Sequence, residues 1–74
     1  MGLKLKQTVV SDRYTAKVYY DYDWQEYQVK FYRGLKTFMG EDCMYHTNDL
    51  EDAINTAKTQ LRYLEQNHGM VCYA

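Results

Sequence analysis

The first half of the chain alternates between apolar and polar positions. Residues 14–21 place every second side chain on one face of an extended segment, and residues 26–32 repeat this alternation. The apolar face of the two segments consists of Tyr14, Ala16, Val18, Tyr20, Tyr27, Val29 and Phe31. A period of two is typical of a half-buried strand, and two such segments separated by about four residues predict a β-hairpin.

A weaker alternation precedes this hairpin. Over residues 3–10, Leu3, Leu5 and Val9 are expected on one side of the chain, with lysines on the other. This pattern indicates a short additional strand at the amino terminus.

Glycines punctuate the segment that follows the hairpin. Gly34 ends the second strand, and a third strand is predicted over residues 37–46, with a bulge or bend at Gly40. The side chains expected to face the core from this strand are Phe38, Cys43 and Tyr45.

The hydrophobic period changes after residue 48. Apolar side chains then recur every three or four positions, which places them on one stripe of an α-helix. The stripe consists of Leu50, Ala53, Ile54, Ala57, Leu61 and Leu64. Asn48 is expected to cap this helix, with Glu51 completing a capping-box pair, and Gly69 marks its end. The sequence therefore predicts a helix over residues 49–67.

Three strands with one apolar face and one amphipathic helix predict an α+β fold. The helix is expected to pack on one face of a three-stranded antiparallel sheet, or a four-stranded one if the amino-terminal segment joins, in the order β-β-β-α. The whole chain, residues 1–74, is expected to form a single domain, since a chain of 74 residues has room for one core.

Charge and composition narrow the function classes. Nine lysines and arginines against ten aspartates and glutamates give a net charge of −1, so the chain lacks the basic excess typical of nucleic-acid binders. No apolar run is long enough for a membrane span or a secretory signal, which makes the cytoplasm the expected location. There Cys43 and Cys72 are expected to stay reduced.

Two cysteines and two histidines are candidate metal ligands in the sequence. Their positions, Cys43, His46, His68 and Cys72, have spacings that a zinc site could use. However, a helix over residues 49–67 would hold His46 and His68 nearly 30 Å apart. The same distance argues against a disulfide between the cysteines, so we expect no metal and no cofactor.

Catalytic patterns are also missing from the sequence. The only serine, Ser11, has no histidine near it in the chain, and no glycine-rich phosphate loop is present. The acidic residues around Glu51 are explained by helix capping. The sequence therefore predicts a protein that is not an enzyme.

The aromatic residues suggest a binding surface. Nine of the twelve aromatic side chains are tyrosines, and alternation places Tyr19 and Tyr32 on the sheet face opposite the helix, among lysines. Tyr22 and Trp24 fall at the hairpin tip. Tyrosine and tryptophan are enriched at protein interfaces. The predicted partner-binding residues are Tyr19, Tyr22, Trp24, Lys30 and Tyr32.

Three interpretations of this surface stay open beside a protein interface. A core this small could be completed by a second copy, which predicts a homo-oligomer. A face of tyrosines and lysines could also stack single-stranded nucleic acid, although the hairpin-tip acids oppose phosphate. Finally, exposed tyrosines are common on strands without any binding role.

Two segments of the chain resemble small uncharacterised proteins of tailed bacteriophages, particularly marine ones. Residues 18–32 carry the tyrosine-rich hairpin, and residues 45–57 carry an Asp/Asn-rich helix start that continues into Glu51, Asp52 and Ala53. The resemblance implies an accessory phage protein that acts in the cytoplasm of a bacterial host. The expected partner is a host or phage protein, and modulation of a host protein is the leading hypothesis. The resemblance brings no activity, cofactor or site residues with it.

Overall fold

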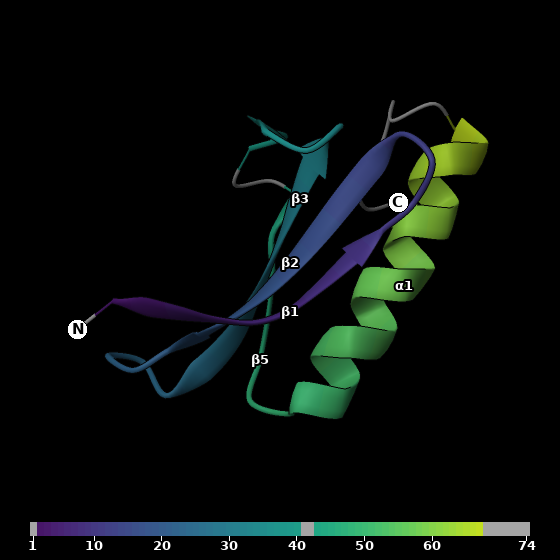
Figure 1. Cartoon of the computed structure of the whole chain (residues 1–74). Coiled ribbons are helices and arrows are strands. Elements are labelled where there is room, and N and C mark those ends of the chain that lie inside the picture. Colours follow the sequence, from purple (N-terminus) through teal and green to yellow (C-terminus); the bar gives the residue numbers. More distant parts are fainter. Residues whose placement is uncertain (1, 41–42, 68–74) are drawn as a thin grey trace.

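The computed structural model describes residues 2–40 and 43–67, and they form the expected α+β fold. The strands are β1 (Leu3–Val10), β2 (Tyr14–Asp21), β3 (Glu26–Arg33), β4 (Thr37–Phe38) and β5 (Tyr45–Thr47), and the helix is α1 (Leu50–Asn67). All strand pairs are antiparallel, and α1 lies on one side of the sheet (Figure 1). Among the described residues, no helix has both the length and the apolar character to cross a bilayer.

The predicted hairpin is confirmed as β2 and β3. The two strands pair along their whole length, and residues 22–25 connect them. Asp21 stabilises this connection because its Oδ1 accepts hydrogen bonds from the backbone nitrogens of Asp23 at 2.9 Å and Trp24 at 3.3 Å. This is the Asx-type geometry that lets a short acidic side chain replace a backbone partner in a turn. Gln25 completes the turn in the left-handed region, with φ of 53°.

The amino-terminal strand is also confirmed, but its register contains a β-bulge. The pairing of β1 with β2 shifts between Leu5 and Gln7, which leaves Lys6 as an extra residue. The bulge reverses the alternation, so Leu3 and Leu5 lie on the face away from the helix while Val9 packs against the core. The prediction that these three side chains share one side is therefore wrong.

The predicted third strand is divided into β4 and β5, which both pair with β3. Phe38, expected in the core, is instead 42% exposed, because its pairing with Tyr32 places it on the face away from the helix. The chain leaves the sheet near Gly40, whose φ of 106° suits glycine. Cys43 is buried and Tyr45 packs against the core, as predicted.

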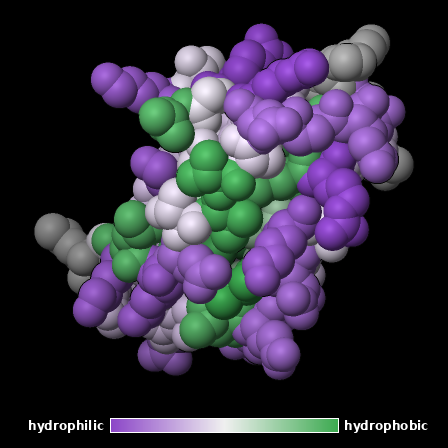
Figure 2. All heavy atoms as spheres, turned by 45° about the vertical axis from the view of Figure 1, so that its right-hand side comes forward, coloured by the Kyte–Doolittle hydropathy of each residue, from purple (hydrophilic) through white to green (hydrophobic). Residues whose placement is uncertain are grey.

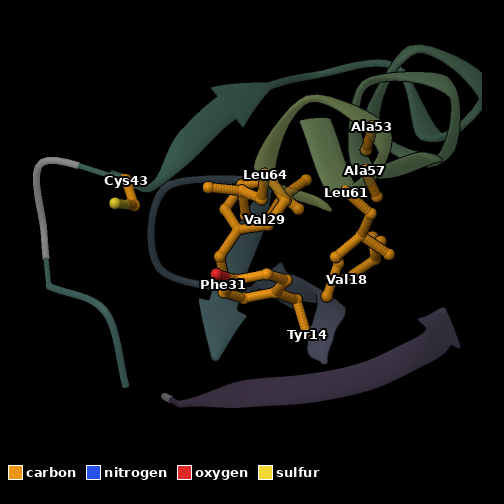
Figure 3. Close-up of a cluster of buried hydrophobic side chains, with 10 residues drawn as sticks. Tyr14, Val18, Val29, Phe31, Cys43, Ala53, Ala57, Leu61 and Leu64 are labelled. Carbon is orange, nitrogen blue, oxygen red and sulfur yellow. The ribbon is translucent and has the colours of Figure 1, made fainter. Parts of the chain in front are cut away.

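The core lies between α1 and the facing side of β2 and β3 (Figure 3). Its buried members are Tyr14, Ala16, Val18, Val29, Phe31, Cys43, Ala53, Ala57, Leu61 and Leu64. Ala53 and Ala57 are fully buried, so small side chains stand where α1 meets the sheet. Leu61, Leu64 and Phe31 supply the larger apolar volume, and each such side chain contributes about 1.5–3 kcal/mol when buried.

The helix α1 begins one residue later than predicted. Asp49 rather than Asn48 is the cap, because Asp49 Oδ1 accepts a hydrogen bond of 3.0 Å from the nitrogen of Glu51. The hydroxyl of Tyr45 donates to Asp52 Oδ2 at 2.7 Å and so ties β5 to the first turn of the helix. The hydrogen bond with Asp52 raises the pKa of Tyr45, so this donor stays protonated at neutral pH.

Near the carboxyl-terminal end of α1, the Glu65 carboxylate contacts the turn between β1 and β2. Glu65 Oε2 accepts hydrogen bonds of 2.6 Å from the Ser11 hydroxyl and 2.6 Å from the backbone nitrogen of Arg13. The hydrogen bond from Ser11, followed by that from Arg13, lowers the pKa of Glu65 below its ordinary value of 4.5. The charged form of Glu65 is therefore the form that stabilises the fold.

We expect Glu65→Gln to destabilise the fold at neutral pH and to lose this effect in acid. A carboxyl group whose pKa is lowered by folding stabilises the protein above its unfolded pKa, and this contribution disappears as the pH falls through the folded value. The measurement is the urea midpoint of both proteins from pH 7 down to below pH 4.5. A difference between the midpoints that does not change with pH would contradict the proposed role of the charge.

Two sequence-based expectations are wrong at Cys43, namely that it stays a reduced thiol and that it forms no disulfide. Cys43 is disulfide-bonded. The only other cysteine of the chain, Cys72, lies outside the described residues. The helix length was expected to separate the two positions. However, β5 carries the chain along β3 to the start of α1, and α1 then returns, so Cys43 and Leu64 share one core (Figure 3).

Candidate interaction surface

The sheet has one face covered by α1 and one face that no described element covers. We call the second one the open face. Residues opposite each other in adjacent strands point to the same side, and alternation away from buried Ala16 and Val18 assigns the members. The open face consists of Leu3, Leu5, Thr8, Val10, Thr15, Lys17, Tyr19, Asp21, Glu26, Gln28, Lys30, Tyr32, Phe38 and His46.

Apolar side chains are exposed at both edges of the open face. Leu3, Leu5 and Val10 on β1, with Phe38 on β4, are 40% to 62% exposed. Single exposed apolar side chains are ordinary, but a set gathered on one uncovered face is typical of a surface that binds another molecule. The sheet therefore presents apolar contacts on either side of its two central strands.

The centre of the open face is a layer of lysines and aromatic rings. Lys17 Nζ lies 4.9 Å from the centroid of the Tyr32 ring, and Lys30 Nζ lies 5.2 Å from that of Tyr19. Lys30 Nζ is also 5.9 Å from the Phe38 centroid, and the Tyr32 and Phe38 rings are 5.6 Å apart. These are cation–π distances, so each ammonium group is held against a ring face.

The two tyrosines of this layer interact directly. Burial raises the pKa of Tyr32 to about 12, and a hydrogen bond with the Tyr19 side chain adds to the effect. The Tyr32 hydroxyl therefore stays protonated at neutral pH and remains a hydrogen-bond donor. Together the rings and ammonium groups form a preordered surface with polar groups at its centre.

One end of the open face carries acidic side chains whose oxygens already have polar partners. Besides holding the turn, Asp21 accepts a hydrogen bond of 2.8 Å from Gln28 Nε2 and is 7% exposed. Glu26 Oε2 lies 2.8 Å from Nδ1 of His46 on β5. These carboxylates therefore have polar partners at this end of the face and do not neutralise the lysines at its centre.

The hairpin tip is separate from the open face. The Tyr22 ring packs edge-on against Tyr20 at 4.9 Å, and Tyr20 in turn packs against Tyr27 at 4.9 Å. Tyr20 and Tyr27 belong to the helix-facing side of the sheet. Trp24 is 77% exposed at the end of the hairpin. Tyr22 and Trp24 thus lie apart from the lysine–aromatic layer.

The five predicted binding residues therefore divide into two groups. The open face brings Tyr19, Lys30 and Tyr32 together, whereas Tyr22 and Trp24 form the tip. The prediction did not include Lys17 as a binding residue, although alternation already placed it among these side chains. It also missed the exposed apolar residues of β1 and β4. The bulge at Lys6 has no clear signal in the sequence, and Gly40 indicated a break in the third strand without showing on which face Phe38 lies.

A second apolar region lies on the helix-facing side. Figure 2 shows a strip of hydrophobic atoms running down the middle of the view beside hydrophilic side chains. Val9 and Ile54 are only partly buried against the core. The adjoining edge of β1 carries Lys4 and the bulged Lys6, and charges and bulges are features that oppose pairing with another strand. The open face is therefore the stronger candidate.

The described side chains give little support for catalysis or for metal binding. The Ser11 hydroxyl contacts Glu65, but a carboxylate whose pKa is lowered is a weak general base. Cys43 is in a disulfide and cannot supply a zinc thiolate, while His68 and Cys72 lie outside the described residues. No group of three or more potential metal ligands was found in residues 2–40 and 43–67.

A hollow beside α1 is lined by uncharged polar side chains. Asn55, Thr56, Thr59 and Gln60 surround it. Gln60 is 8% exposed, and its Nε2 has no hydrogen-bond partner within the described part of the chain. A buried amide without a partner costs about 1–3 kcal/mol. The hollow contains no charged group that could drive a reaction.

Comparison with models of known protein families, with curated proteins and with solved structures finds no significant match.

Proposed function

We propose that this chain is a non-enzymatic protein-binding module that contacts its partner through the open face. The observation that carries the proposal is the exposure of Leu3, Leu5, Val10 and Phe38 around a preordered layer of tyrosines and lysines. Aromatic residues with a polar group are frequent hot spots because they bury a large area at small entropic cost. The covered face supplies the apolar core, so the exposed side chains of the open face are available for a partner.

The proposed biological setting follows from the bacteriophage resemblance of residues 18–32 and 45–57. The partner is then a protein of the bacterial host, and the chain acts as an accessory factor in the host cytoplasm. The disulfide at Cys43 weighs against that compartment, because disulfides are rare in reducing cytosol. The proposed binding surface does not depend on the compartment.

The test compares two aromatic double variants in a pull-down from bacterial lysate, quantified by mass spectrometry. Tyr32→Ala with Phe38→Ala removes two rings of the open face, whereas Tyr22→Ala with Trp24→Ala removes two rings of the tip. We expect the open-face variant to lose the partner, with affinity reduced on the order of 30-fold or more for a hot-spot truncation. The tip variant should retain it.

Circular dichroism provides the folding control for both variants. Recovery of the same proteins by the wild type and a folded open-face variant would refute the proposed surface. Loss of the partner by the tip variant alone would move the interface to the hairpin end.

A further inference from the structure

Two lysines at the centre of the open face have no carboxylate partner among residues 2–40 and 43–67. Lys17 and Lys30 are directly opposite each other in the β2–β3 register, an arrangement in which like charges repel. No ion pair to either lysine is found in the described parts of the chain. The aromatic rings offset part of the repulsion, but rings carry no net charge. A bound anion would therefore be attracted to this position.

The charges of the chain are unevenly distributed around this position. Residues 1–36, which supply β1 to β3, carry seven lysines and arginines against four acids. Residues 37–74, which supply α1, carry two against six. The net charge of −1 is therefore the sum of +3 over residues 1–36 and −4 over residues 37–74. Within the open face itself, Lys17 and Lys30 at the centre are matched in number by Asp21 and Glu26 at one end. The positive charge is therefore local to the centre, where it attracts complementary charge.

We propose that the open face binds an acidic segment of a partner protein in which Asp or Glu alternates with apolar residues. This inference rests on the proposed function and specifies the chemistry of its partner. In the complex, the segment's carboxylates contact the Lys17 and Lys30 ammonium groups. Its apolar side chains pack on Leu5 and Phe38 at the two edges. With strands about 4.8 Å apart and about 3.3 Å per residue, β1 to β3 with eight residues each and the five residues of β4 and β5 give roughly 460 Å² per side. This area is near the lower limit for a specific interface.

A second copy of the chain fits this face less well. In a symmetric dimer the same surface meets itself, so the central lysines of both copies would come together. The acids that could neutralise them, Asp21 and Glu26, already have hydrogen-bonding partners. The lysine pair therefore opposes face-to-face self-association.

Single-stranded nucleic acid also fits less well. Bases bind such sheets by stacking on exposed aromatic faces. On the open face, however, the ammonium groups of Lys17 and Lys30 already lie over the Tyr32 and Tyr19 rings. A base could stack on that side only after a lysine moved away.

The experiment selects binders from a randomised peptide library on the immobilised wild-type protein. We expect enrichment of sequences in which acidic and apolar residues alternate. The most enriched peptide is then synthesised and its affinity measured by fluorescence anisotropy at low and high salt. Lys17→Gln with Lys30→Gln should weaken binding about tenfold or more, and added salt should weaken binding to the wild type. The matched control, Lys58→Gln with Arg62→Gln, removes two exposed charges from α1 and should bind like the wild type.

Three results would overturn the inference. The first is enrichment of peptides without acidic residues, or binding that the lysine variant leaves unchanged. The second is binding of a labelled single-stranded oligonucleotide that the lysine variant abolishes. The third is a concentration-dependent dimer in sedimentation that the lysine variant dissociates. If the lysine variant keeps a lysate partner that Tyr32→Ala with Phe38→Ala loses, the proposed function stands and only the acidic chemistry of the partner fails.

Discussion

Phe31→Ala is expected to lower the free energy of unfolding by about 3–5 kcal/mol, the usual cost of removing a buried phenylalanine. Phe31 on β3 is fully buried in the core that also contains Leu64, and its loss would leave a cavity in that core. A domain of this length has a total stability of about 4–11 kcal/mol at typical values per residue. The variant should therefore be close to unfolding at room temperature. Urea denaturation followed by far-ultraviolet circular dichroism measures this loss.

Phe38→Ala is the matched control for Phe31→Ala, because Phe38 is the only other phenylalanine of the chain. The sequence pattern places both rings in the core, whereas the structure leaves Phe38 42% exposed on the open face. Phe38→Ala should therefore cost less than about 1 kcal/mol, as is usual for a surface substitution. Equal losses for the two variants would mean that Phe38 is buried and that the edge of the open face is wrongly assigned. Trp24 is a poor fluorescence probe here because it is exposed in the folded chain.

The hairpin and the helix could be predicted because each repeats its signal several times. Seven apolar positions with a period of two define β2 and β3, and six positions with a helical period define α1. The bulge at Lys6 has no such repetition. It is a single extra residue without glycine or proline, and only the pairing with β2 reveals it. One such residue was sufficient to move Leu3 and Leu5 to the opposite face.

The candidate surface was predictable to the same extent as the strands that form it. Tyr19, Lys30 and Tyr32 lie on regular parts of the hairpin, so alternation placed them together correctly. Tyr22 and Trp24 lie in a turn, where no period determines the direction of a side chain. Contacts such as the packing of Tyr22 on Tyr20 depend on the turn geometry set by Asp21. The lysine–ring contacts likewise depend on rotamers that the sequence pattern does not specify.

Reduction of the disulfide at Cys43 is expected to lower the free energy of unfolding by about 3 kcal/mol. A disulfide restricts the unfolded chain, so breaking it restores the conformational entropy that opposes folding. Cys43 is also 3% exposed, so the disulfide is attached to the packed core. Relative to a total of about 4–11 kcal/mol, this loss leaves the reduced chain with a stability of about 1–8 kcal/mol.

The Cys43→Ala variant separates the disulfide from the general effect of a reducing agent. Dithiothreitol should lower the urea midpoint of the wild type and leave that of Cys43→Ala unchanged. Maleimide labelling of the denatured, unreduced wild type should add no mass, because a disulfide has no thiol to react. Labelling of both cysteines, or equal responses of the two proteins to reductant, would contradict the disulfide. Since cytosolic thiols are kept reduced, the same measurement decides whether the chain is stable enough to act in the proposed bacterial cytoplasm.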